Sequence, residues 1–139
     1  MAGIVPTEAR IARLAAEGPE GPIIMVNLLK YRKRAAYEPD RPEAKENLSG
    51  LEAYRRYGAV ALKHVMALGG RIVWAGAQKL VVAGDDASDD WDEIVCVNYP
   101  SRTAFLSMIQ DPDYLAAHYH RDAGLERTAL LCCSAGTAA

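Results

Sequence analysis

Three side chains in the last third of the sequence have the types and spacing of a small acid–base site. Tyr114, His118 and Arg121 follow one another at intervals of four and three residues, so on a helix they share one face. A neutral imidazole accepts a proton near neutral pH, and a guanidinium binds a carboxylate or an enolate-like oxygen. The pattern therefore predicts His118 as a general base and Arg121 as an anion clamp.

Each of these residues also has a purely structural interpretation. Arg121 can pair with Asp113 or Glu126 at the surface, and His118 and His120 can be ordinary helical residues. His120 lies about 200° from His118 around a helix, so the two histidines cannot chelate one metal ion. A polar cavity reached by His118 and Arg121 would favour the functional interpretation.

Polar groups from other segments complete the candidate site. Asn27 interrupts an apolar run, and a buried amide without a partner costs roughly 1–3 kcal/mol. Its partner is a ligand, Tyr54 or a neighbouring backbone group. Tyrosines supply apolar rings with polar tips, which suit a pocket rim and, more often, a core. We assign catalysis to His118 and Arg121, expect no metal and no cofactor, and assign ligand binding to Asn27, Tyr54, Tyr57 and Tyr114.

Composition restricts the class of protein. The 139 residues correspond to one domain, half of them are hydrophobic, and the formal net charge of −2 argues against a nucleic-acid partner. No apolar run approaches the about 18 residues of a membrane span, and the first residues lack a secretory signal, so we expect a cytoplasmic protein without a membrane partner. The three cysteines form no CxxC pair and are interpreted as small buried hydrophobes.

Hydrophobic periodicity predicts the elements that hold these residues. Helices are predicted at 7–17, 49–69, 101–109 and 111–124, and strands at 23–30, 71–82 with a bend at Gly76, 93–99 and 128–133. Ser49 and Glu52 have the spacing of a capping box, which defines the start of the second helix. Apart from the first helix, the order is β-α-β-β-α-β, the ferredoxin-like arrangement of an α+β protein with a four-stranded antiparallel sheet. We expect an N-terminal helical extension at 1–21, the ferredoxin-like domain at 22–135 and a tail at 136–139.

The strands predict an assembly as well as a fold. In the first strand both Ile23 and Met25 on one face and Ile24 and Val26 on the other are apolar. Two helices cover only one face of such a sheet, so the second apolar face needs another cover. We expect a second copy of the chain, sheet on sheet, in a symmetric homodimer. The alternative is that the N-terminal helix folds across the open face.

Several segments resemble one family. They are Met25–Tyr31, Tyr54 with Tyr57 and Gly58, the glycines 69, 70 and 76, Trp91–Ser101 and Asp111–Arg121. Together they resemble the domain-of-unknown-function family 1330, a branch of the dimeric α/β-barrel superfamily. The resemblance covers roughly residues 22–135 and implies the same fold, the homodimer and a small-molecule pocket between sheet and helices. It implies no particular reaction, and the N-terminal extension and the last-helix histidines set this chain apart from the family.

The run from Met108 to His118 is also similar to a helix of haem-degrading monooxygenases in that superfamily. In those enzymes the matching histidine binds iron, and an asparagine that matches Asn27 assists. Met108 stands where they have a tryptophan, which argues against haem degradation. We therefore expect a small-molecule-binding homodimer that is a cofactor-independent oxygenase, isomerase or lyase acting on a small anionic or aromatic compound. The alternatives are a non-catalytic ligand-binding or structural dimer and, as a lesser one, a haem-degrading protein.

Overall fold

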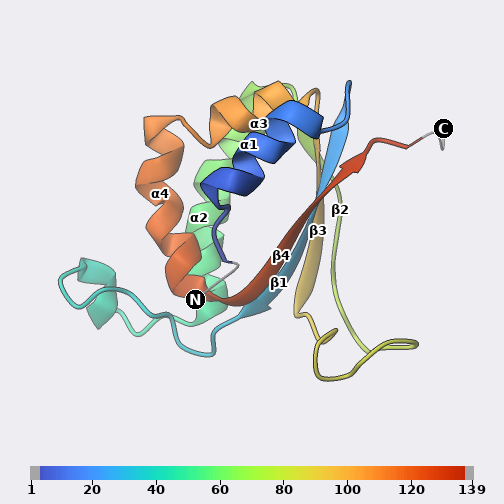
Figure 1. The fold of residues 1–139 in the computed structure, drawn as a ribbon. Helices are drawn as coiled ribbons and strands as arrows, with labels where there is room; N and C mark the ends of the chain where they lie inside the picture. Colours follow the sequence, from blue (N-terminus) through green and yellow to red (C-terminus); the bar gives the residue numbers. More distant parts are fainter. Residues whose placement is uncertain (1–3, 137–139) are drawn as a thin grey trace.

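An antiparallel sheet positions every other element. In the computed structural model, which describes residues 4–136, its strands lie in the order β2-β3-β1-β4 (Figure 1). The strands are β1 (Ile23–Tyr31), β2 (Arg71–Ala77), β3 (Glu93–Tyr99) and β4 (Leu125–Ser134). Helices connect β1 to β2 and β3 to β4, so the predicted ferredoxin-like α+β fold is confirmed.

The helices begin where side chains cap them. They are α1 (Glu8–Glu17), α2 (Gly50–Ala67), α3 (Arg102–Met108) and α4 (Pro112–Gly124), with a short 3-10 turn, η1 (Pro42–Lys45). The Ser49 hydroxyl accepts from the Glu52 amide at 3.1 Å, and the Glu52 carboxylate accepts from the Ser49 amide at 2.9 Å, so the predicted capping box is confirmed. Within residues 4–136 no helix is both long and apolar enough to cross a membrane.

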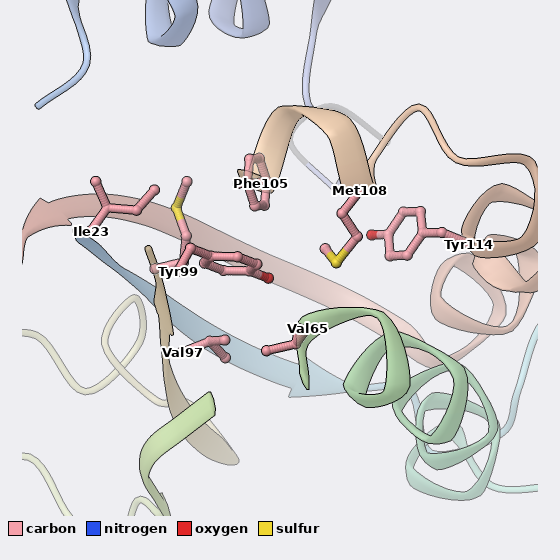
Figure 2. Packing of buried hydrophobic residues seen from close by; sticks show 8 residues of the cluster. Ile23, Val65, Val97, Tyr99, Phe105, Met108 and Tyr114 are labelled. Carbon is pink, nitrogen blue, oxygen red and sulfur yellow. The ribbon is translucent and has the colours of Figure 1, made fainter. Parts of the chain in front are cut away.

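The core fills the space between the sheet and the helices. Its buried side chains come from alternate positions of β1 and β3, such as Ile23 and Val97, and from the helices above them. Figure 2 shows that the hydroxyl ends of Tyr99 and Tyr114 point into the space between the two layers, beside Met108. The apolar core between the sheet and the helices therefore also contains hydroxyl groups.

The N-terminal helix α1 lies on the same side of the sheet as the other helices and packs against α3 (Figure 1). The alternative in which this helix crosses the open face is therefore wrong. The opposite face carries a cross-strand row of Trp74, Cys96, Val26 and Leu131, in which Trp74 is 54% and Leu131 48% exposed. An apolar face is thus left uncovered by the described residues.

Strand β2 is shorter than the sequence predicts. It ends at Ala77, opposite the first residue of β3, so residues 78–82 have no neighbouring strand to bond. The predicted continuation through 78–82 is wrong for this reason. The irregularity in the pairing lies between Ile72 and Trp74, whereas the sequence predicted it at Gly76.

Strand β4 also departs from the prediction. It begins at Leu125, directly after α4, rather than at Thr128, because it pairs with the full length of β1. The interpretation of the cysteines as buried is wrong, since Cys132 and Cys133 are exposed and Cys96 is only half-buried. Because β4 lies at an edge of the sheet, side chains at its far end remain accessible to solvent.

Two glycines let α2, α4 and the end of β1 meet at backbone distance. The Gly50 amide donates to the Arg32 carbonyl at 3.0 Å, and the Arg32 amide donates to the Gly124 carbonyl at 2.8 Å. A side chain at Gly50 would overlap the Arg32 backbone, and one at Gly124 would overlap the Gly50 carbonyl. This junction fixes the start of α2 against the end of α4, so side chains of the two helices face one another.

Gly50→Ala should lower the free energy of unfolding by roughly 1–3 kcal/mol, because the added methyl group overpacks the junction. Gly58→Ala on the same helix is the matched control, since its methyl group meets open space. That substitution should raise the free energy by about 0.5–1 kcal/mol through helix propensity. Urea unfolding of both variants measures the difference, and equal effects would contradict a tight junction.

Candidate functional site

A cavity of about 210 Å³ lies between the sheet and the helices. Five of the six predicted site residues line it, namely Asn27, Tyr57, Tyr114, His118 and Arg121. Its remaining wall is apolar and includes Met25, Phe105 and Met108. The structure therefore brings polar groups from β1, α2 and α4 around one small space.

Arg121 is a buried cation at the C-terminal end of α4. Its side chain is only 5% exposed, and it donates to the main-chain carbonyl of Ile4. No carboxylate of the described residues lies within ion-pair distance, so the predicted surface pairing with Asp113 or Glu126 is wrong. The negative end of the helix dipole favours a positive charge there, although it does not replace a counter-ion.

His118 lies one turn before Arg121 on the same helix. Its ring meets that of Tyr57 edge-on and that of Tyr114 at a tilt, with ring centroids 5.9 and 5.8 Å away. Its Nδ1 is 3.5 Å from Asp122 Oδ1, a buried carboxylate oxygen that has no hydrogen bond within the described residues. Asp122 was not predicted, although its position four residues after His118 was visible in the sequence. A carboxylate beside Nδ1 orients the imidazole ring.

Tyr57 and Tyr114 form a hydroxyl pair at the cavity. Their Oη atoms are 2.8 Å apart. Burial raises the pKa of both phenols, and the positive charge of Arg121 opposes this rise only in part. Both tyrosines are therefore neutral near physiological pH, and one hydroxyl proton remains free to donate to a ligand.

Asn27 finds its partners in the backbone. Its Nδ2 donates to the Val95 carbonyl at 3.1 Å and to the Met25 carbonyl at 3.4 Å. Tyr54 is not its partner and lies outside the cavity wall, where it packs on Leu29 and Leu125.

His120 belongs to a separate cluster on another side of α4. Its Nδ1 is 2.6 Å from the Tyr37 hydroxyl, and its ring stacks on Tyr119. The Tyr119 hydroxyl donates to Glu43 at 2.7 Å, which attaches the loop between β1 and α2 to α4. The structural interpretation of His120 agrees with these contacts.

The donor set and the size of the cavity limit what it can hold. Nowhere in residues 4–136 do three His, Cys, Asp or Glu side chains converge as a metal site requires. The volume of about 210 Å³ is below the roughly 300–1,000 Å³ of pockets for drug-sized ligands, so the cavity suits a compound of few heavy atoms rather than a haem.

The fold and this cavity define a ferredoxin-like α+β protein with a small, partly polar space beneath its helices. The chain belongs to the family described as a domain of unknown function (DUF1330), which matches residues 44–134. The family predicted from the sequence is therefore confirmed. The comparison with curated proteins gives no match.

Solved structures are similar to the chain over nearly its whole length. The protein RPA0582 of Rhodopseudomonas palustris, a protein of unknown function, is 36% identical with a TM-score of 0.86, and the match covers 99% of this chain and 100% of that chain. A structure of methylated RPA0582 is 38% identical with a TM-score of 0.87, covering 99% and 98%. A dimeric protein of unknown function and ferredoxin-like fold from Bacteroides fragilis NCTC 9343 is 14% identical with a TM-score of 0.47, covering 81% and 95%.

The match to RPA0582 includes the N-terminal extension, because it covers 99% of this chain and all of the relative. The extension therefore does not set this chain apart from that relative. In the described residues it consists of α1 and of the flanking residues 4–7 and 18–21, and its Val5 and Pro6 contribute to the cavity wall.

His120 should titrate below the ordinary histidine pKa of 6.5, because burial disfavours its charged form. Its contribution to the free energy of unfolding is then complete above pH 6.5 and is lost as the pH falls through the folded-state pKa. An NMR titration of the ring protons measures this, with the urea-unfolded protein as reference. A native pKa at or above the unfolded one would contradict the burial of His120 described above.

Proposed function

We propose that this protein is a homodimer that binds a small carboxylate in the cavity of each subunit and moves a proton on it without a cofactor. The reaction class is an isomerisation or a lyase-type elimination. It begins with loss of a C–H proton, from the carbon next to the carboxylate in a 2-hydroxy acid or from the carbon next to the keto group in a 2-oxo acid. The alternative is that the cavity binds the same ligand without chemistry.

The observation that carries this proposal is the buried guanidinium of Arg121. A buried charge without a counter-ion costs several kcal/mol, and one hydrogen bond to the Ile4 carbonyl satisfies a fraction of its five donors. A carboxylate in the adjoining cavity would supply the missing negative charge and accept two parallel hydrogen bonds. The charge and its surroundings are thus complementary to a small organic anion.

His118 supports the catalytic part of the proposal. Its neutral imidazole takes the proton as the C–H bond of the ligand breaks, and the electron pair remains on the ligand as an enolate. Arg121 and the Tyr57–Tyr114 hydroxyl pair face the same cavity and stabilise the enolate oxygen. Return of the proton from the imidazolium to the ligand completes an isomerisation and restores the neutral base.

The homodimer is supported by the open face of the sheet. The row of Trp74, Cys96, Val26 and Leu131 is flanked by Leu28 and Ile94, which point the same way. Because the helices of the described chain all lie on the other side, this apolar surface meets water in an isolated subunit (Figure 1). The same face of a second copy covers it without any further segment.

Two substitutions should separate binding from chemistry. Arg121→Met should weaken binding of a small 2-hydroxy or 2-oxo carboxylate by at least about tenfold, because a charge-assisted hydrogen bond is lost. His118→Gln should retain binding and slow exchange of the ligand's C–H proton for deuterium by about 10²–10⁴-fold. Calorimetry measures the affinity, and NMR in heavy water measures the exchange.

Arg56→Met is the matched control, because Arg56 pairs with Glu46 at the surface and does not line the cavity. It should change neither affinity nor exchange. Unchanged affinity in Arg121→Met would contradict the proposal that Arg121 binds the carboxylate of the ligand. Binding without any exchange in the unaltered protein would leave the non-catalytic alternative as the function.

The dimer should have twice the chain mass of 15.1 kDa in light scattering at micromolar concentration. Trp74→Glu should give a single subunit, because a charge would be buried in the sheet-to-sheet contact. Leu80→Glu is the control, since Leu80 is equally apolar and 70% exposed but lies outside the sheet. A monomeric unaltered protein would contradict this assembly.

A further inference from the structure

A second cavity of about 280 Å³ adjoins the first beneath α1. The two cavities share part of their walls, including Val5, Pro6, Ile11 and Arg121. Arg121 thus stands where they meet, with the polar cavity on one side and the second cavity on the other.

The second cavity has a different lining from the first. Aliphatic side chains from α1 and from β4 dominate it, among them Ile11, Leu14 and Leu130. Its neutral polar groups offer a ligand little, because the Thr128 hydroxyl already donates to the Leu28 carbonyl at 2.7 Å and a thiol is a weak donor. The space therefore suits a hydrocarbon group rather than a polar one.

We propose that this second cavity binds the aliphatic chain of the same ligand, which makes that ligand an aliphatic 2-hydroxy or 2-oxo carboxylate. This inference rests on the proposed function, because it takes the carboxylate to lie on Arg121. The polar group at the neighbouring carbon then enters the first cavity, towards Tyr57, Tyr114 and His118. The chain enters the second cavity, between α1 and β4.

Of the two arginines that line the second cavity, the buried one fits the carboxylate. Arg121 is 5% exposed and lines both cavities, whereas Arg10 is an exposed residue of α1 and lines only the second. A solvated guanidinium gains little from an ion pair, while a desolvated one gains much more. The ligand is therefore oriented with its head inward and its chain along α1.

The dependence of affinity on chain length tests this inference. Straight-chain 2-hydroxy carboxylates of about three to ten carbons are titrated into the full-length protein by calorimetry. The dissociation constant should fall about threefold to fourfold for each added methylene group until the cavity is full. Arg121→Met should weaken every member at least about tenfold, and Arg10→Met should change each by less than about twofold.

The two neighbouring cysteines provide a test that needs no variant. Cys132 lines the second cavity and is exposed, whereas Cys133 is on the opposite face of β4, the face that the proposed homodimer covers. A saturating medium-chain acid should slow alkylation of Cys132 by at least about tenfold and leave Cys133 unchanged. A saturating three-carbon acid should change neither rate by more than about twofold.

Affinity independent of chain length, or equal protection of Cys132 by short and long acids, would overturn the inference and leave the anion site intact. A greater loss in Arg10→Met than in Arg121→Met would overturn the orientation of the ligand. Failure of acids of every length to bind would overturn the proposed function together with the inference. Increasing affinity with protection confined to Cys132 supports both.

Discussion

The contact between Gly50 and Gly124 is the constraint on which the site depends. The Gly50 amide and the Gly124 carbonyl both bond the backbone of Arg32, and no side chain fits between the helices there. Because α2 begins and α4 ends at this point, the two helices approach closely along their lengths. The hydroxyls of Tyr57 and Tyr114 can therefore meet at 2.8 Å, and α4 can present its last two turns to the cavity. The two glycines let the backbones of α2 and α4 come into contact, and this close approach brings polar side chains of both helices together in the apolar space above the sheet.

The site combines groups whose burial opposes stability. A desolvated guanidinium, a carboxylate oxygen of Asp122 without a hydrogen bond and two buried phenols all lie on or beside α4. Each such group costs free energy that the apolar core must offset. The dipole of α4 and the carbonyl of Ile4 reduce the cost at Arg121 without removing it. Unsatisfied charge concentrated in one place is typical of a binding site rather than of a scaffold.

Local sequence rules predicted most of the helices and strands, and they predicted which side chains of α4 share one face. Periodicity and caps gave the elements, because a capping box such as that of Ser49 is written within four residues. Helical spacing placed Tyr114, His118 and Arg121 on one face. The sequence could not show that Arg121 meets Ile4, 117 positions away, or that Asn27 bonds to the backbone, because both facts depend on packing. The predicted length of β2 was too great for the same reason, because β2 ends where its partner β3 begins.

Helix α1, which lies over the second cavity, is attached to the rest of the described molecule by few contacts. Helix α1 contributes no buried side chain. It is held by its packing on α3, by the Ile4 carbonyl on Arg121, and by Arg102, which donates to the carbonyls of Gly18 and Pro19. Detaching it exposes little apolar surface, so such an opening requires far less free energy than global unfolding. A ligand then enters or leaves the two cavities through movement of this one short helix, and the cavities exchange with solvent while the sheet stays intact.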